Sequence, residues 1–145
     1  MERLSNLSWD AVQEGDELPR LTFGPVTVTH LVKDAAGTRD LYPIHHDREF
    51  ARANGARDIF FNTMWYQGFI GRYVTTEWAG HEALLRRLAF SMRGPNCPGD
   101  VITARGRVLK KYQQDGRKLV DLDVRLDNQL GPDQVIASVT VEFAR

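Results

Sequence analysis

The sequence of 145 residues has little cysteine, no long apolar run and no excess of charge of either sign. Cys97 is the single cysteine, so it can form neither an intrachain disulfide nor a multi-cysteine zinc site. Apolar runs such as 59–61 are far shorter than the roughly 20 residues that a membrane-spanning helix needs. The first ten residues also lack the apolar segment of a signal peptide, and we therefore expect a cytoplasmic protein with no membrane partner.

The charged residues balance, with 19 basic and 19 acidic side chains and a formal net charge of +0. A protein that binds nucleic acid needs a net basic surface or a clear basic stripe, so we expect no nucleic-acid partner. The balance still permits a small basic patch that holds one phosphate group. We also expect no metal site, because no His-Glu-x-x-His spacing occurs among the four histidines, which are His30, His45, His46 and His81.

The length is common for a chain with one hydrophobic core, and we expect residues 1–145 to form a single domain. Residues 21–29 are rich in β-branched and aromatic side chains, which predicts a strand interrupted at Gly24-Pro25. The residues before this strand have the composition of a turn-rich lead-in.

Three segments have the spacing and the caps of helices, namely 30–37 after Thr29, 48–54 after Asp47, and a long segment that ends near Trp78 and is capped by Asn62 or Thr63. The long segment contains Gly68 and Gly71, each of which costs about 1 kcal/mol relative to alanine inside a helix. Two such costs in one helix predict that another part of the protein, such as sheet backbone, approaches it closely.

After Gly80 the apolar period falls to two, and four strands are expected at 84–93, 101–112, 117–128 and 134–144, with turns at 94–100, 114–116 and 131–133. In the third strand, valine and leucine alternate with aspartate and arginine, which is typical of an antiparallel sheet with one buried and one solvated face. Helices that precede such a sheet indicate an α+β protein. With the apolar face wrapped around the long central helix, the predicted architecture is a single hotdog fold.

The segment from Asp40 to His45 is the strongest candidate for chemistry. It places a carboxylate and an imidazole five residues apart on a loop that Pro43 braces, directly before a helix. A carboxylate and an imidazole that grip one water can pass its protons out and back, which is general acid–base catalysis. The alternative from the residues alone is structural, with Asp40 capping the turn and His45 buried and satisfied.

The same segment resembles the motif of the MaoC-like (R)-specific enoyl-CoA hydratases, a family of hotdog proteins with the pattern Asp-x-Asn-Pro-Ile/Leu-His-x-Asp. The positions that match are Asp40, Pro43, Ile44, His45 and Asp47, then Phe50, Ala51 and Gly55, and later Pro98, Gly99 and Asp100. Residues 37–80 are similar in more detail to one subgroup, the small subunits of actinobacterial hydratases that degrade steroid side chains. In that subgroup, small and large hotdog subunits form heterotetramers, and the small subunit carries the catalytic pair.

The resemblance implies syn addition of water across a trans-2-enoyl-CoA, or the reverse dehydration of a 3-hydroxyacyl-CoA, with bulky or steroid acyl groups among the substrates. His45 would act as the base on the water, and Asp40 would hold the water and exchange a proton with the α carbon. The backbone N–H of Thr63 would stabilise the thioester oxygen. No metal or cofactor is implied, since the acyl-CoA is the substrate. The resemblance further implies a homodimer, or a heteromer with a related larger hotdog subunit.

Two departures from the family pattern change the expected pocket. Tyr42 stands where the family usually has asparagine, and Asn62-Thr63 stands where it usually has His-Gly. Thr63 keeps its backbone N–H but narrows the space beside the substrate. Tyr42 either shapes the pocket or packs, and Asn62 either orients the substrate or caps the helix.

Two other functions stay open. A hotdog thioesterase places a carboxylate on the central helix, where this chain offers only Glu77 near the helix end. A non-catalytic partner subunit is expected to lose the Asp–His pair, which this chain keeps. The basic residues that could bind the CoA phosphates are Arg86, Arg87, Arg93, Lys110 and Lys111. For each of them taken singly, the simpler interpretation is a charged side chain on a solvated face.

Overall fold

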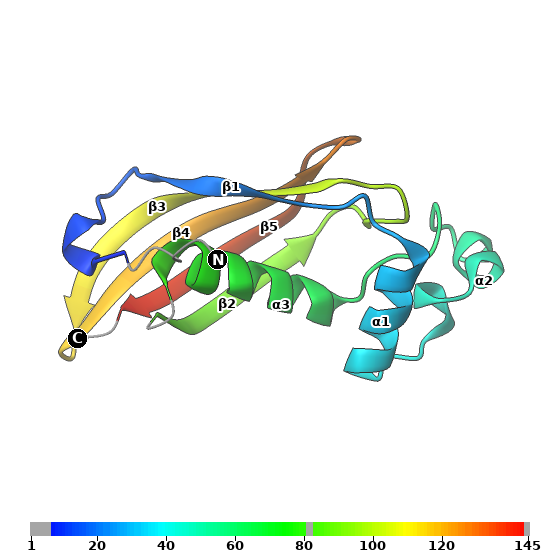
Figure 1. Cartoon of the computed structure of the whole chain (residues 1–145), viewed down its shortest axis with the longest axis horizontal. Helices are drawn as coiled ribbons and strands as arrows, with labels where there is room; N and C mark the ends of the chain where they lie inside the picture. Colours follow the sequence, from blue (N-terminus) through cyan, green and yellow to red (C-terminus); the bar gives the residue numbers. More distant parts are fainter. Residues whose placement is uncertain (1–6, 81–82, 144–145) are drawn as a thin grey trace, which may run out of the picture.

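The computed structural model describes residues 7–80 and 83–143, which form one five-stranded sheet with helices on one side and at one end of it (Figure 1). The strands are β1 (Glu17–Phe23), β2 (Leu84–Met92), β3 (Ile102–Gln114), β4 (Arg117–Asn128) and β5 (Gly131–Phe143). The α-helices are α1 (Val28–Thr38), α2 (Arg48–Ala53) and α3 (Thr63–Arg72). Two 3-10 helices, η1 (Trp9–Ala11) and η2 (Pro43–His45), and a π-helix, η3 (Tyr73–Ala79), lie between them.

The strands are ordered β1-β3-β4-β5-β2, and each neighbouring pair is antiparallel. The sheet curves over α3, which runs along its concave face, while α1 and α2 lie beyond one end of the strands (Figure 1). β1 and β2 form the two edges of the sheet. A sheet wrapped around one helix confirms the predicted α+β hotdog fold.

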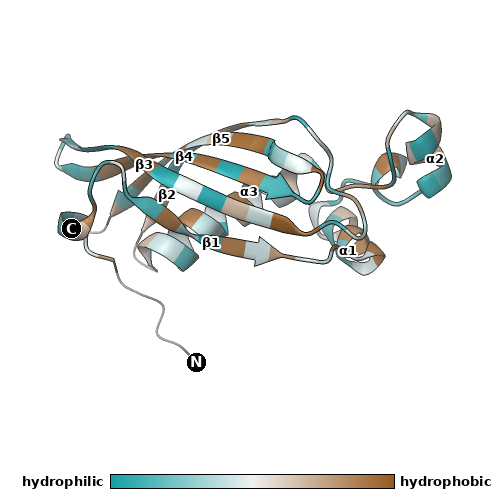
Figure 2. Cartoon of the chain, turned by 90° about the horizontal axis from the view of Figure 1, so that it is seen from above, coloured by the Kyte–Doolittle hydropathy of each residue, from teal (hydrophilic) through white to brown (hydrophobic). Residues whose placement is uncertain are grey.

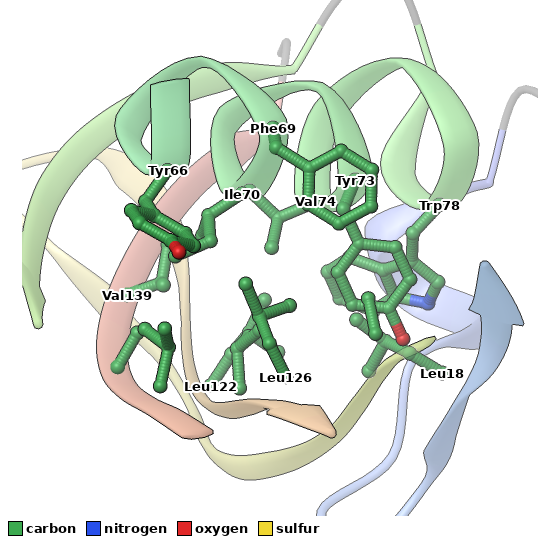
Figure 3. Close-up of a cluster of buried hydrophobic side chains, with 14 of the residues drawn as sticks. Leu18, Tyr66, Phe69, Ile70, Tyr73, Val74, Trp78, Leu122, Leu126 and Val139 are labelled. Carbon is green, nitrogen blue, oxygen red and sulfur yellow. The ribbon is translucent and has the colours of Figure 1, made fainter. Parts of the chain in front are cut away.

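The inner face of the sheet supplies most of the core. Leu122 and Leu126 of β4 have no exposed surface and face the side chains of α3, as Figure 3 shows. Burial of one such leucine contributes about 1.5–3 kcal/mol. A slip of one residue would turn the whole apolar set of β4 to solvent, so this face also fixes the strand register.

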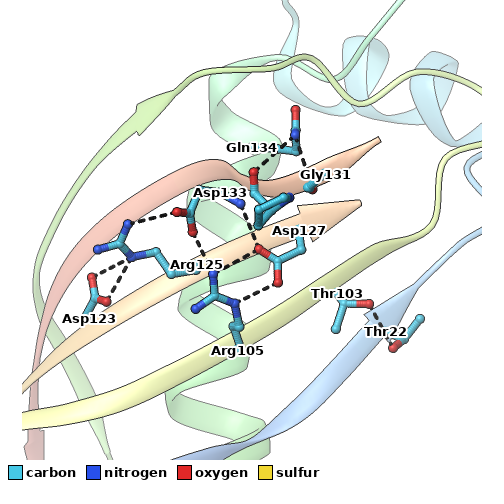
Figure 4. Close-up of polar contacts among 10 residues, drawn as sticks. Thr22, Thr103, Arg105, Asp123, Arg125, Asp127, Gly131, Asp133 and Gln134 are labelled. Atoms are coloured by element: carbon cyan, nitrogen blue, oxygen red, sulfur yellow. Dashed lines mark hydrogen bonds and ion pairs between the residues drawn. The ribbon is translucent and has the colours of Figure 1, made fainter. Parts of the chain in front are cut away.

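The outer face of the sheet carries ion pairs that join three adjacent strands (Figure 4). Arg105 of β3 donates to Asp127 of β4 and to Asp133 of β5, each at 2.7 Å. Arg125 donates to Asp123 at 2.9 Å along β4 itself. Figure 2 shows the alternation of polar and apolar residues along the strands.

The predicted long helix is present but changes type along its length. Regular α-helix ends at Arg72, and the chain continues as the π-helix η3. The sequence predicted that another part of the protein approaches Gly68 and Gly71 closely. This prediction is wrong for the described residues, 7–80 and 83–143. A Cβ on Gly68 would meet nothing within 4 Å, and one on Gly71 would meet only Leu85 Cδ2, at 3.6 Å. The physical reason is orientation, since Gly68 lies on the exposed side of α3.

β1 starts at Glu17, earlier than the predicted residue 21. Pro19 is tolerated inside it because β1 is an edge strand, and its pairing with β3 is irregular between Leu18 and Leu21. Residues 17–20, which have a turn-rich composition, therefore form the first half of β1.

Helix α1 is capped by Thr27 rather than by the predicted Thr29, and it runs past Gly37. The Thr27 hydroxyl accepts a hydrogen bond from the His30 N–H at 3.2 Å, and His30 Nδ1 accepts one from the Thr27 N–H at 3.1 Å. Histidine thus replaces the glutamate or glutamine of the usual capping box. The helix ends at Thr38, and its C-terminal cap, Arg39, has a left-handed φ of 57°.

The last hairpin turns at 129–130, ahead of the predicted turn at 131–133, because β5 already begins at Gly131. The Asn128 side chain accepts a hydrogen bond from the Leu130 N–H at 2.9 Å and stabilises this tight turn. His81 and the last residue of the predicted strand 134–144 lie outside the described residues. Within those residues, no helix combines the length and the apolar character needed to cross a membrane.

Candidate active site

Asp40 follows directly on the C-terminal cap of α1. Its backbone N–H donates to the Ala35 carbonyl at 3.0 Å, and the Arg39 N–H donates to the Ala35 and Ala36 carbonyls. These bonds satisfy the last carbonyls of the helix, as C-terminal caps do. The backbone of Asp40 is therefore fixed to the end of a packed helix.

His45 ends the short helix η2, whose first turn contains Pro43. The N–H groups of His45 and Asp47 donate back to the carbonyls of Tyr42 and Pro43, at 3.1 and 2.7 Å. The predicted cap at Asp47 is confirmed, because its side chain accepts a hydrogen bond from the Phe50 N–H at 3.0 Å. The loop is thus braced on both sides of His45.

The side chains of Asp40 and His45 meet. His45 Nε2 lies 3.4 Å from Asp40 Oδ2, and the two side chains are 10% and 30% exposed, His45 being the more buried. His45 Nδ1 lies 2.7 Å from the carbonyl oxygen of Phe60. Because a carbonyl oxygen only accepts, Nδ1 must carry the proton, and Nε2 of the neutral ring then holds the free lone pair. The site therefore presents a base whose free nitrogen faces a carboxylate.

Asn62 joins the start of α3 to α1. Its side-chain oxygen accepts a hydrogen bond from the Trp65 N–H at 3.0 Å, and its amide donates to the Thr38 hydroxyl at 2.7 Å. Of the two predicted caps, Asn62 is the one observed. Thr63 is the first helical residue, so its N–H is one of the donors that have no carbonyl partner within the helix.

The loop between α2 and α3 is held by a buried carboxylate. Arg57 pairs with Asp100 at 2.5 Å, and Asp100 also accepts hydrogen bonds from the Cys97 N–H and from Gln129, at 2.8 and 2.6 Å. These three donors compensate the burial of the carboxylate. The loop that carries Phe60 is thus attached to the Pro-Gly-Asp turn at 98–100.

Asp34 is a third carboxylate near the pair, and the sequence analysis missed it. Its Oδ2 accepts a hydrogen bond from the Asn62 N–H at 3.2 Å. Burial raises the pKa of Asp34 above the usual 3.8; the hydrogen bond and His45 oppose this shift, and Asp40 adds to it. The only signal in the sequence is that Asp34 and Thr38 are four residues apart, on one helix face.

The remaining candidates have other partners. The Tyr42 ring packs edge-to-face on Phe50, with 5.5 Å between centroids, and its role in a pocket stays a prediction. His46 Nε2 lies 3.0 Å from the Leu41 carbonyl. Cys97 is fully buried, and burial raises the pKa of its thiol, which is the opposite of what a nucleophile needs.

Two of the basic residues considered for the CoA phosphates are engaged within the protein. Arg86 pairs with Glu142, and Lys111 lies over the Trp9 ring, 4.2 Å from its centroid. Contact between any of the five basic residues and CoA stays a prediction.

Comparison with known proteins gives one close sequence relative. A scan against protein-family models finds no match. The chain is 39% identical over 115 residues to the 3-oxo-4,17-pregnadiene-20-carboxyl-CoA hydratase beta subunit of Mycobacterium tuberculosis (strain ATCC 25618 / H37Rv). The match covers 79% of this chain and 84% of the relative.

Solved structures agree with this relationship. The crystal structure of the ChsH1-ChsH2 complex from Mycobacterium tuberculosis matches with a TM-score of 0.80 and 35% identity, over 91% of this chain and 98% of that one. The R-hydratase PhaJ1 from Pseudomonas aeruginosa, in the unliganded form, shares the fold, with a TM-score of 0.84 and 19% identity over 97% and 87% of the two chains.

The fold and the site define a hotdog protein that carries an Asp–His pair on the segment between α1 and α2. The chain belongs to the MaoC-like (R)-specific enoyl-CoA hydratase family, as its 39% identity to a hydratase subunit over most of both chains shows. The family resemblance found in the sequence is thus confirmed, including the subgroup of steroid side-chain hydratase subunits.

Proposed function

We propose that this chain is a catalytic subunit that adds water syn across a trans-2-enoyl-CoA and, in reverse, dehydrates a 3-hydroxyacyl-CoA. The observation that carries the proposal is the 3.4 Å contact between His45 Nε2 and Asp40, combined with the Phe60 carbonyl, which places the proton of the neutral ring on Nδ1. One water held between these two groups would touch both a base and a carboxyl.

The proposed reaction moves protons only through this pair. His45 Nε2 takes a proton from the water while the water oxygen bonds to C3, and the electron pair of the C2=C3 bond passes toward the thioester oxygen. The enolate then receives a proton at C2 from the pair, through Asp40. The pair gains one proton and gives one, so it returns to its starting state. Because both groups act from one side, the hydroxyl and the hydrogen add to the same face.

The backbone N–H of Thr63 is the proposed donor to the developing negative charge on the thioester oxygen. It stands at the first position of α3, where the helix dipole is positive and the N–H has no partner within the helix. Donors of this kind, aimed at charge that appears in the transition state, are among the larger contributions to catalysis. Its use needs no side chain, so threonine in place of the family's glycine keeps the group.

The geometry disfavours the thioesterase alternative. Glu77 lies in η3, about fifteen residues beyond the start of α3 and so roughly 20 Å along the helix axis. It also pairs with Arg72 at 2.6 Å, which occupies the carboxylate that a thioesterase would use. Retention of Asp40 and His45 in contact likewise disfavours a purely supporting subunit.

We propose that the substrates include bulky, steroid-like acyl-CoAs and that the chain assembles with a related, larger hotdog subunit. The support is the relative named as a beta subunit of a pregnadiene-carboxyl-CoA hydratase and the similarity to a chain of the ChsH1-ChsH2 complex. The free edge of β2 offers a surface for such a partner, since Leu84 and Met92 are exposed on it. Unpaired edge strands of this length invite a partner strand. A homodimer through the same edge is the other arrangement.

The decisive experiment follows the absorbance of enoyl-thioesters, from crotonyl-CoA to a steroid enoyl-CoA, after addition of the protein. We expect the wild type to consume them, and Asp40→Asn and His45→Ala to lose about 10²–10⁴-fold in kcat/KM. Asp115→Asn, in an exposed turn, is the matched control and should keep full activity. Equal activity in the two site variants would refute these roles, and release of free CoA would indicate a thioesterase.

The partner is tested by co-expression with the product of a neighbouring hotdog gene, followed by mass measurement of the purified assembly. Leu84→Lys should weaken the assembly, because it places a charge on the β2 edge. Leu109→Lys, at a similarly exposed position in β3, is the control. A complex of equal mass and stability in both variants would place the interface elsewhere.

A further inference from the structure

Asp34 joins α1 to the start of α3, although neither the family motif nor the Asp40–His45 pair includes it. Its carboxylate oxygen accepts the hydrogen bond from the Asn62 N–H at 3.2 Å, across the contact between α1 and α3. Asn62 is the cap of α3, and the next residue, Thr63, bears the N–H proposed to bind the thioester oxygen. The position of that N–H therefore depends on a residue of α1.

A second path between the same two helices runs through Thr38. The Thr38 hydroxyl donates to the Asp34 carbonyl at 2.7 Å and accepts a hydrogen bond from the Asn62 amide at 2.7 Å. Asn62 is thus bound to α1 through both its backbone and its side chain. Such double attachment limits the motion of the helix start, which must stay in place for an oxyanion donor to act.

We propose that Asp34 is a positioning residue for the hydration reaction, which anchors the start of α3 through Asn62 and thereby holds the Thr63 N–H in place. The inference rests on the proposed function and names a residue that acts through other groups rather than on the substrate.

Two substitutions test this role. Asp34→Asn keeps an oxygen that accepts the Asn62 N–H, whereas Asp34→Ala removes the acceptor. We expect Asp34→Ala to lose about tenfold in kcat with little change in KM, and the conservative Asp34→Asn to keep the kcat of the wild type. Lys33→Gln changes one charge on the exposed face of the same helix and is the control.

A readout other than activity keeps the test independent of the reaction. Amide hydrogen exchange at the start of α3 should be faster in Asp34→Ala and unchanged in Asp34→Asn. An inactive wild type with this difference in exchange present would refute the proposed function alone. Unaltered exchange in Asp34→Ala would overturn the role of Asp34, whether or not the wild type is active.

Discussion

The backbone carbonyl of Phe60 determines which nitrogen of His45 faces Asp40. It lies 2.7 Å from Nδ1, and Nε2 lies 3.4 Å from the Asp40 carboxylate. The two contacts lie on opposite sides of the ring, so the imidazole is held in one tautomer and one orientation. A general base needs both properties, because its free nitrogen must point at the water before the substrate arrives.

We predict that His45→Asn folds normally but lacks hydratase activity. The asparagine amide can replace Nδ1 as donor to the Phe60 carbonyl, but it offers no base at the place of Nε2. The expected loss in kcat/KM is about 10²–10⁴-fold, measured with an enoyl-CoA, with a melting temperature close to that of the wild type. The exposed neighbour His46→Asn should remain active. A His45→Asn variant that kept a tenth of the activity would show that another group is the base.

Gly24→Ala should destabilise the protein. Gly24 has a φ of +130°, and a Cβ at this position would lie 2.7 Å from the Asp100 carbonyl oxygen. The expected cost is about 1–3 kcal/mol in the free energy of unfolding, measured by urea denaturation. Gly37→Ala is the opposite case, because Gly37 lies within α1 and its Cβ would meet nothing within 4 Å. Gly37→Ala should raise the free energy of unfolding by about 0.5–1 kcal/mol. Equal stabilities in the two variants would contradict the described contact between Gly24 and Asp100.

Tyr66→Phe should lower the free energy of unfolding by more than the removal of one oxygen atom suggests. The Tyr66 hydroxyl accepts hydrogen bonds from the backbone N–H and the side-chain amide of Asn96, at 3.3 and 3.0 Å. Both residues are fully buried, and burial raises the pKa of Tyr66 to about 12, so its hydroxyl stays neutral. Phenylalanine would leave two buried donors unpaired, at a cost of about 1–3 kcal/mol. Tyr112→Phe, at the surface, should change stability by less than about 0.5 kcal/mol. An unchanged stability of the Tyr66→Phe variant would mean that water replaces the hydroxyl.

The sheet and the central pair were predictable because each depends on residues close together in the sequence. Alternation in β4 identifies a strand from its own residues, and Asp40 and His45 belong to one short loop. The same holds for the caps at Asp47 and Asn62, whose partners lie three residues later.

The parts that could not be predicted depend on contacts between distant segments or on unusual partners. Asp34 meets Asn62 across 28 residues of sequence, and no local pattern marks the two as neighbours. The cap at Thr27 uses a histidine in place of an acidic residue or glutamine. The exposure of Gly68 could not be predicted, because a glycine inside a helix does not by itself indicate whether that side of the helix faces a neighbour or solvent.

Asp127, on the outer face of the sheet, should make the stability of the protein depend on pH (Figure 4). Burial by itself would raise the pKa of Asp127, but hydrogen bonds from Arg105 and from the Asp133 N–H outweigh it and leave the pKa below the usual 3.8. Asp127 therefore binds a proton more tightly in the unfolded chain than in the folded protein. The stabilisation is complete above the usual pKa and is lost as the pH falls through the lowered value.

Asp127→Asn should therefore lower the free energy of unfolding by about 1 kcal/mol at neutral pH, a value reduced by the partial exposure of Arg105. The difference from the wild type should persist at any pH above the usual pKa of 3.8 and close as the pH falls through the lowered pKa of Asp127. Urea denaturation at a series of pH values measures it, with Asp115→Asn in an exposed turn as the control for loss of one charge. A difference that stayed constant into acid would mean that Asp127 acts through packing, because only the ionised carboxylate gives a pH-dependent contribution.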